Sequence, residues 1–260
     1  MERSFLTLGG IALELAQGGS GTPIVVLHGF EKLAGDPPLF DMLARNARVI
    51  APSHPGFGGS PLPDWIDAID DLSYLYLDLL DTLDLREVVL VGFSMGGWIA
   101  AEMAVKCVHR LTHLVLVSPL GVKPGGRESR DMPDIFALAP DEVGGLIWHD
   151  RALAPHLATM PDDAAEQLLK QQEAAALYLW EPYMHDPKLR RRLHRVGVPT
   201  LVLRGTADGL VSEAHARAFC AGLPNARYEP LPDAGHVPEY EQPEALAERI
   251  LGFAGLAAGR

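Results

Sequence analysis

Two kinds of hydrophobic pattern predict the strands of this chain. Two short alternating runs, Ser4 to Leu8 and Ile11 to Ala16, are separated by Gly9 and Gly10, which predicts an antiparallel hairpin with a tight turn. Compact apolar runs rich in β-branched residues then predict strands with both faces buried, as in a parallel sheet. These runs are Ile24 to His28, Arg48 to Pro52, Val88 to Gly92, Leu114 to Val117, Thr200 to Leu203 and Arg227 to Leu231.

Amphipathic patterns between these runs predict helices. From Asp67 to Leu85, apolar residues recur at steps of three and four against an acidic face. An Ala-rich helix should start near Met95, and later helices should span Ser212 to Ala221 and Pro243 to Phe253. The alternation of strand and helix predicts an α/β fold with a mixed, mostly parallel sheet.

The alternation stops from about Gly121 to Val198. Only helical patterns occur there, at Asp141 to Trp148, Pro161 to Leu179 and Lys188 to Val196. A segment of this length is too long for a single loop in a compact domain. We therefore predict a core of residues 1–120 and 199–260, with residues 121–198 inserted as a helical cap after the sixth strand.

Composition excludes several classes of partner. The 260 residues are 48% hydrophobic, enough for a large core, and a formal charge of -12 opposes binding to nucleic acid. Cys107 and Cys220 lie in predicted apolar helices, so we expect reduced core thiols and a reducing compartment. The start of the chain lacks a signal-peptide pattern, and no run of 18 uncharged apolar residues occurs. A cytoplasmic protein without membrane association is expected.

The sequence Gly92-Phe93-Ser94-Met95-Gly96 is the strongest candidate for chemistry. It fits the pattern G-x-S-x-G between a buried strand and a helix, which is the context of a nucleophile elbow. A residue on so sharp a turn has a strained backbone, and the neighbouring strand and helix leave no room for side chains at Gly92 and Gly96. The alternative is that Ser94 is only a small polar residue at a buried turn.

A serine nucleophile needs a base and an acid that orients it. His236 lies in a loop between the last strand and the last helix, and Asp208 follows the strand Thr200 to Leu203. Each residue alone has an ordinary interpretation, as a solvated loop histidine and as a turn or helix-capping aspartate. Together, Ser94, Asp208 and His236 occur in the order Ser, Asp, His, each after a strand, which is the order of the nucleophile-elbow enzymes.

The loop after the strand Ile24 to Leu27 predicts the oxyanion hole. The backbone N–H groups of Phe30 and Met95 are expected to bind one oxygen together. His28, at the start of this loop, is interpreted as bonding nearby backbone rather than as a second base or a metal ligand. No H-E-x-x-H motif or Cys/His cluster occurs, so neither a metal nor a cofactor is expected.

Five stretches together resemble the α/β-hydrolase family: LHGF at Leu27, APSHPGFGGS at Ala51, GFSMGG at Gly92, VPTLVLRGTAD at Val198 and AGHVPEYEQPE at Ala234. The resemblance covers nearly the whole chain. It implies an eight-stranded, mostly parallel sheet, a helical cap, a triad of Ser94, Asp208 and His236, and no cofactor. Ser53 stands where many members have Asp, at a position expected to be structural.

Departures from the family pattern narrow the activity. Ser94 replaces the aspartate nucleophile of haloalkane dehalogenases and epoxide hydrolases, so those activities are disfavoured. Carbon-carbon bond hydrolases of ring-cleavage products carry a glycine-rich H-G-x-G-P-G loop, an Asn before the serine and often a Trp after the histidine, whereas this chain has HGFEKL, Phe93 and Val237. We expect a hydrolase of small, mainly apolar carboxylic esters. The alternatives are carbon-carbon cleavage of a dienoate and a small-molecule receptor on a hydrolase scaffold.

The substrate, a small molecule, should bind between Ser94 and the cap. Expected wall residues are Trp148, Trp180, Tyr183 and Val237, with Leu177, Tyr178 and Met184 as further candidates, although core packing is the alternative for each. Glu31 either faces this pocket, where it selects against anionic substrates, or faces solvent. The arginines of KLRRRLHR, at Lys188 to Arg195, are interpreted as a solvated helix face, and the alternative is that one of them reaches into the cleft to hold a substrate carboxylate. The sequence does not decide between a monomer and a homodimer.

Overall fold

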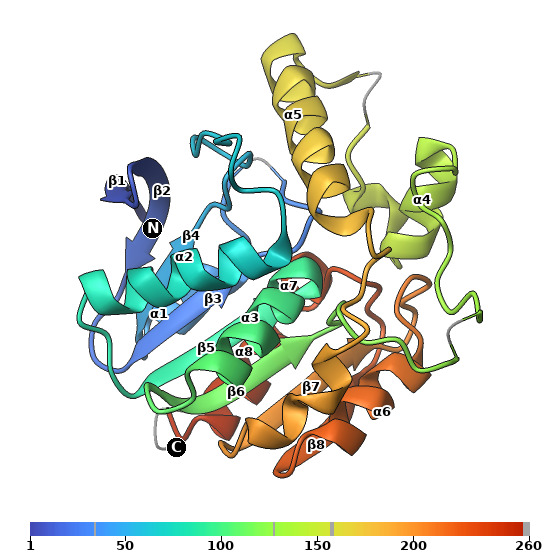
Figure 1. Ribbon diagram of the computed structural model, residues 1–260. Helices are drawn as coiled ribbons and strands as arrows, with labels where there is room; N and C mark the ends of the chain where they lie inside the picture. Colours follow the sequence, from blue (N-terminus) through green and yellow to red (C-terminus); the bar gives the residue numbers. More distant parts are fainter. Residues whose placement is uncertain (34, 127, 157–158, 257–260) are drawn as a thin grey trace.

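One eight-stranded sheet organises the protein. The computed structural model describes residues 1–33, 35–126, 128–156 and 159–256, and the strands lie in the order β1-β2-β4-β3-β5-β6-β7-β8 (Figure 1). Strands β1 and β2 form the predicted antiparallel hairpin, and β2 also pairs antiparallel with β4. The remaining neighbours pair in parallel. The strands are β1 (Glu2–Leu8), β2 (Ile11–Gly18), β3 (Pro23–Leu27), β4 (Arg48–Pro52), β5 (Val88–Phe93), β6 (Leu111–Val117), β7 (Thr200–Gly205) and β8 (Ala226–Leu231).

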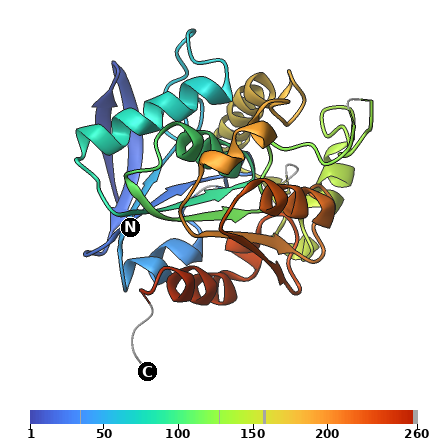
Figure 2. The same cartoon turned by 60° about the horizontal axis from the view of Figure 1, so that its bottom comes forward.

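Helices cover both faces of the sheet (Figure 2). Helices α1 (Pro38–Ala44) and α8 (Pro243–Phe253) pack on one face. Helices α2 (Ile69–Thr82), α3 (Ser94–Lys106) and α6 (Glu213–Gly222) pack on the other. Successive residues of β5 alternate between the two hydrophobic cores, with Leu90 in one and Val89 and Val91 in the other. The absence of polar positions in this strand follows from that double burial.

Residues 121–198, which lie between β6 and β7, are called the insertion. The described residues of the insertion form α4 (Pro140–Ile147), α5 (Asp162–Leu179) and short 3-10 turns, which include η1 (Arg151–Leu153), η3 (Leu189–Arg191) and η4 (Leu193–Arg195). Figure 1 shows α4 and α5 standing beyond the carboxyl ends of the central strands. The single helix expected from Lys188 to Val196 is therefore wrong. Residues Leu189, Leu193 and Val196 are buried as their spacing indicated, but Pro187 and Pro199 confine the segment and its turns close through bonds between residues three apart.

The two cysteines are free thiols and are only partly buried. Cys107 lies just past the end of α3, and Cys220 lies in the last turns of α6, so neither belongs to the fully buried core that the helix patterns suggested.

No helix in the described part of the chain is long and apolar enough to span a membrane.

Candidate functional site

Ser94 occupies the turn between β5 and α3. Its backbone has a φ of 50°, in the left-handed region that residues with side chains rarely adopt. A Cβ atom at Gly92 would lie 2.3 Å from the carbonyl oxygen of Gly96, and one at Gly96 would lie 2.2 Å from the carbonyl oxygen of Leu27. The two glycines are therefore required by close backbone approach, as the G-x-S-x-G pattern predicted.

His236 and Asp208 meet Ser94 at the carboxyl ends of the strands. Asp208 follows β7, and His236 lies in the loop between β8 and α7 (Pro238–Glu241). The Nε2 atom of His236 is 2.8 Å from Ser94 Oγ, and its Nδ1 atom is 3.0 Å from Asp208 Oδ2. Ser94 is 4% exposed and His236 is 2% exposed. The three side chains thus form one continuous hydrogen-bonded chain that is almost closed to solvent.

The surroundings fix the orientation and charge of this chain. Asp208 Oδ1 accepts hydrogen bonds from the backbone N–H groups of Leu210 and Val211, which leaves Oδ2 for the imidazole. Burial alone would raise the pKa of Asp208, but the imidazole and the amide donors outweigh it and lower that pKa. Burial alone would lower the pKa of His236, yet Asp208, Glu239 and Glu31 outweigh it and raise that pKa.

The loop that follows β3 lies directly against the serine. A Cβ atom at Gly29 would lie 3.0 Å from Ser94 Cβ, and the Phe30 ring centroid is 5.9 Å from that of His236. Within the described residues, neither the amide of Phe30 nor that of Met95 donates a hydrogen bond to another backbone or side-chain group. Both amides are therefore free to bind an oxygen that develops charge next to Ser94.

Two histidines, the buried His54 and the partly buried His28, hold this loop in place, and the sequence had pointed only to His28. His28 Nδ1 donates to the Gly29 carbonyl oxygen (2.6 Å), and His28 Nε2 accepts from the backbone N–H of His54 (2.9 Å). His54 Nε2 donates to the His28 carbonyl oxygen (2.9 Å) and its Nδ1 accepts from Tyr76 Oη (2.5 Å). Burial lowers the pKa of His54 to about 3, so its ring is neutral. The interpretation of His28 as a backbone-bonding residue is consistent with these contacts.

The sequence signal for His54 was the stretch Ser53-His54-Pro55-Gly56. It belongs to one of the stretches that resemble the family, but nothing in it showed that the imidazole contacts the loop after β3. The partner, Tyr76, belongs to the amphipathic face of α2 and was expected only as a core residue. Side-chain contacts between such distant segments follow from the strand order, which the local pattern does not specify.

The insertion is bonded to the loops that carry the acid and the base. The backbone N–H of Gly209 donates to the Leu146 carbonyl oxygen (2.9 Å), and that of His236 donates to the Ile147 carbonyl oxygen (2.7 Å). Leu146 and Ile147 form the carboxyl end of α4. The carboxyl end of α4 is therefore bonded to the backbone of His236 itself and to that of Gly209, the residue that follows Asp208.

A pocket of about 750 Å³ lies between the insertion and the loop after β3. Its wall is mainly apolar and includes Phe30, Ile135, Leu138, Val143, Trp148 and Leu168. Polar groups on the wall include Glu31, Arg151 and Gln172. Ser94 and His236 are not among the lining residues, but Phe30 is, and its ring centroid lies 5.9 Å from that of His236. A concave, largely apolar space is the usual form of a small-molecule site.

Only some of the expected wall residues take this position. Trp148 lines the pocket, but Trp180 is 58% exposed because it follows the last turn of α5 and points away from the core. Tyr183 instead bonds the loop at Pro133 and Ile135, and Val237 is buried beside the histidine without contributing to this wall. Leu177 is largely exposed, whereas Tyr178 and Met184 are core residues.

The arginines of Lys188 to Arg195 do not reach this pocket. Arg190, Arg191 and Arg195 are exposed at the surface, as expected for the solvated side of the segment. The arginine on the pocket wall is Arg151, which follows α4 and donates to the Asp141 carbonyl oxygen (3.0 Å). Nothing in the sequence around Arg151, which follows a helix of the insertion, predicted that this residue lines the pocket.

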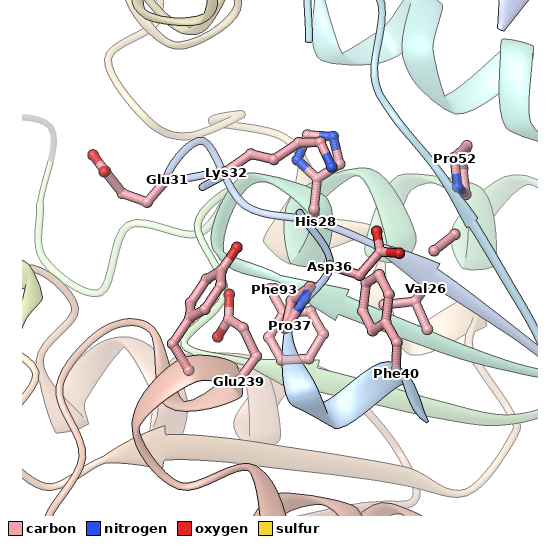
Figure 3. A pocket seen from close by; sticks show the side chains of 12 residues that line it. Val26, His28, Glu31, Lys32, Asp36, Pro37, Phe40, Pro52, Phe93 and Glu239 are labelled. Atoms are coloured by element: carbon pink, nitrogen blue, oxygen red, sulfur yellow. The ribbon is translucent and has the colours of Figure 1, made fainter. Parts of the chain in front are cut away.

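Two carboxyl groups lie near the histidine. Burial raises the pKa of Glu31 to about 7 and that of Glu239 to about 8. Glu239 is 5% exposed and faces a cavity of about 20 Å³ together with His28 and Phe93. Figure 3 shows the Glu31 side chain extending away from Glu239 and the other labelled side chains. Glu31 thus borders both this small cavity and the large pocket.

No group of three or more His, Cys, Asp or Glu side chains in the described part of the chain could hold a metal ion. The candidate site consists of Ser94, His236 and Asp208, with the loop after β3 packed against the serine. A mixed sheet with such groups at its carboxyl edge is typical of the nucleophile-elbow hydrolases.

The comparison with protein families gives the same result. Residues 24–249 match the family described as the alpha/beta hydrolase family. The protein belongs to this family, and it is an enzyme of the alpha/beta hydrolase type.

Similar proteins include both longer and equally long chains. At 30% identity, the chain spans 64% of the dihydrolipoyllysine-residue acetyltransferase component of the acetoin cleaving system from Pseudomonas putida, with 91% of this chain covered. It spans 12% of the polyketide synthase ThaQ from Burkholderia thailandensis, again at 30% identity and with 94% of this chain covered. The pimeloyl-[acyl-carrier protein] methyl ester esterase from Aromatoleum aromaticum is 30% identical, with 87% of this chain and 96% of that protein covered.

Solved structures with the same fold include two hydrolases. The thermophilic esterase from Thermogutta terrifontis has a TM-score of 0.74 and 26% identity, covering 97% of this chain and 98% of the esterase. The meta-cleavage product hydrolase from Pseudomonas fluorescens IP01 has a TM-score of 0.79 but 18% identity, covering 97% of each chain. The second likeness, at that identity, concerns the fold alone.

Proposed function

We propose that this protein is a serine hydrolase that cleaves small, mainly apolar carboxylic esters through an acyl-enzyme on Ser94. The observation that carries the proposal is the hydrogen-bonded chain from Ser94 Oγ to His236 Nε2 (2.8 Å) and from His236 Nδ1 to Asp208 Oδ2 (3.0 Å). A serine hydroxyl becomes a useful nucleophile when a neighbouring base accepts its proton and an acid orients that base. The similarity to two proteins named as esterases supports ester substrates.

In this mechanism His236 takes the proton as Ser94 Oγ attacks the ester carbonyl carbon. The backbone N–H groups of Phe30 and Met95 stabilise the resulting oxyanion, and Asp208 stabilises the imidazolium. His236 then gives the proton to the leaving alcohol, and the acyl group stays on Ser94. Water, deprotonated by His236, attacks the acyl-enzyme and releases the acid, which returns the serine to its starting state.

The pocket and the insertion define the substrate in this proposal. The insertion acts as a cap over Ser94, and the apolar wall around Trp148 and Leu168 holds the hydrocarbon part of the ester. A formal charge of -12 repels anionic molecules at long range, which favours neutral substrates.

Replacement of Ser94 tests the mechanism. Ser94→Ala should lower kcat on an activated ester by a factor of about 10⁴ or more, because the nucleophile is lost while the oxyanion donors remain. The matched control is Ser4→Ala on the exposed hairpin strand β1, which should keep full activity. If the Ser94 variant retained most of its turnover, the assignment of the nucleophile would be wrong.

Carbon-carbon cleavage of a dienoate is a second candidate, because Arg151 places a cation on the pocket wall where a substrate carboxylate could bind. Steady-state turnover of a ring-cleavage dienoate beside a panel of neutral esters compares the two activities. Faster turnover of the dienoate, lost in Arg151→Gln, would favour this candidate.

A receptor on the same scaffold makes a different kinetic prediction. A fluorophosphonate probe followed by mass spectrometry should label Ser94 in either case. Repeated turnover of an ester supports the enzyme, whereas labelling with only a single slow turnover supports the receptor.

A further inference from the structure

Glu31, the residue after Phe30, has no hydrogen-bond or ion-pair partner among the described residues. Its side chain lines the 750 Å³ pocket. Burial and the charge of His236 are the influences on its carboxyl group, with no hydrogen bond among them. The neighbouring polar groups of the same loop are used to hold the loop, since Gln171 donates to the Lys32 carbonyl oxygen (3.4 Å) and the Leu33 amide donates to Tyr240 Oη (3.2 Å).

This unpaired carboxyl group matters when a substrate enters. The wall opposite is mainly apolar, so a bound hydrocarbon chain displaces water from Glu31 without replacing its hydrogen bonds. A polar group left unpaired in this way lowers the affinity for that substrate, and a substrate that supplies the missing partner is selected. The selectivity arises because a substrate without such a partner binds with a less favourable free energy, since it leaves the Glu31 carboxyl group without a hydrogen bond.

We propose that Glu31 is a specificity-determining residue that binds a hydroxyl group of the substrate, so that the preferred esters carry a hydroxyl within a few bonds of the scissile carbonyl on an otherwise apolar chain. The proposal rests on the ester-hydrolase function proposed above. We place the hydroxyl close to the scissile carbonyl because Glu31 is the next residue after Phe30, whose amide is expected to bind the carbonyl oxygen.

A hydroxyl is the partner that fits both charge states of Glu31. Burial raises the pKa of Glu31 to about 7, so the carboxylate and the carboxylic acid are both populated near neutral pH. A hydroxyl donates to the carboxylate and accepts from the acid, whereas an ammonium group pairs only with the carboxylate and a substrate carboxylate pairs only with the acid. Repulsion of a substrate carboxylate by ionised Glu31 agrees with the expectation of selection against anions.

The experiment compares esters that differ only in the hydroxyl. Ethyl octanoate is measured beside ethyl β-hydroxyoctanoate, with the hydroxyl in the acyl half, and beside the hydroxyethyl ester of octanoate, with the hydroxyl in the alcohol half. For the native enzyme, kcat/KM should be higher by about tenfold for one of the two hydroxylated esters. Glu31→Met, which keeps the size but removes the hydrogen bond, should bring this ratio close to one, and Glu31→Gln should restore much of it.

The control lies on the same pocket wall. Gln172→Met removes another polar side chain from the pocket and should leave the ratio unchanged. A ratio that Glu31→Met leaves within about twofold of the native value overturns the proposal, as does a β-amino ester or a dicarboxylate monoester that outperforms both hydroxylated esters. If Ser94→Ala abolishes cleavage while the Glu31 variants leave the ratio unchanged, ester hydrolysis stands and the role of Glu31 falls.

Discussion

At the scale of single residues, the carboxyl groups around His236 set the charge of its ring. Asp208 accepts from Nδ1, and Glu239 and Glu31 add negative potential within the same buried region. Their combined effect exceeds the cost of burying an imidazolium and raises the pKa of His236. A histidine that acts as a base must be neutral, so the pKa of this ring defines the lower edge of the active pH range.

Asp208→Asn should change both the rate and its pH dependence. The acidic limb of the profile of kcat/KM against pH should have its midpoint above the ordinary histidine pKa in the native enzyme, because activity rises as His236 loses its proton. In the variant, the Asp208 carboxylate that raises the pKa of His236 is gone, while the burial that lowers this pKa remains. The midpoint should therefore move to lower pH. The maximal rate should also fall by about 10⁴, because the imidazole loses its orientation.

The control for this prediction is Asp233→Asn, an exposed residue of the same loop. It should leave the midpoint and the rate unchanged. An unaltered midpoint in the Asp208 variant would mean that other groups set the charge of His236.

Ser53 is a second residue whose role depends on its surroundings. Many family members have Asp at this position, and here the carboxylate comes from Glu14 of β2 instead. Glu14 Oε2 accepts from Ser53 Oγ (2.9 Å) and from the Gly59 amide (2.8 Å), while Oε1 accepts from Arg3 (2.7 Å). The turn after β4 is thus held by a carboxylate supplied from a neighbouring strand, which supports a structural role for Ser53.

At the scale of elements, hydrophobic periodicity predicted the bounds of a helix best where one face of that helix is buried along its whole length. Helix α8 spans Pro243–Phe253 as expected, since Pro243 marks its first turn and its apolar positions face a single core. The turn at Ser94 was also predictable, because the strand, the helix and the two glycines are adjacent in sequence. Helices α1 and α7 were not predicted, since each is short and begins at a proline that also fits a loop.

The pocket was less predictable than the candidate triad. Ser94, Asp208 and His236 each follow a strand, and parallel strands end at one edge of a sheet, so their meeting follows from topology. Trp148 and Trp180 both end helices of the insertion, yet only Trp148 turns toward the pocket. Which way such a side chain points depends on how the insertion packs against the loops beneath it, and no local pattern specifies that packing.

Helix α5 is joined to the loop after β4 by one buried hydrogen bond. Tyr178 Oη donates to the Pro55 carbonyl oxygen (3.0 Å), next to Gly56, where a Cβ atom would lie 2.5 Å from that of Ala174. Because His54 in the same loop supports the His28 carbonyl, the helix, this loop and the loop after β3 form one packed unit.

Tyr178→Phe should weaken this unit. It removes the donor and leaves the Pro55 carbonyl unpaired, so the free energy of unfolding should fall by about 1–2 kcal/mol in urea titrations. Tyr74→Phe, on the exposed side of α2, provides the comparison and should change that free energy by less than about 0.5 kcal/mol. Equal effects of the two substitutions would show that the Pro55 contact does not stabilise the fold.

At the scale of the whole molecule, stability should be uneven. Strands β3, β5, β6 and β7 are covered by helices on both faces, whereas α5 buries one side and exposes residues such as Leu169 and Leu177. Local opening is easiest where few buried contacts are lost.

Amide hydrogen exchange followed by mass spectrometry measures this difference. The central strands should exchange slowest and α5 markedly faster. Helix α3, whose residues are almost all buried, should exchange as slowly as the strands. This comparison of two helices shows whether burial, rather than helical structure itself, sets the exchange rate. Protection of α5 equal to that of β5 would contradict the expectation.

The bonds between α4 and the loops that carry Asp208 and His236 have a consequence for mutational screens. Because Leu146 and Ile147 contribute carbonyl oxygens to those loops, substitutions that displace the end of α4 also displace the acid and the base. A library scored by colour or growth would rank such positions with Ser94, Asp208 and His236 themselves, although the bonds to those loops are made by backbone carbonyl groups. Labelling of Ser94 by an active-site probe in each library member distinguishes a misaligned triad from an absent one.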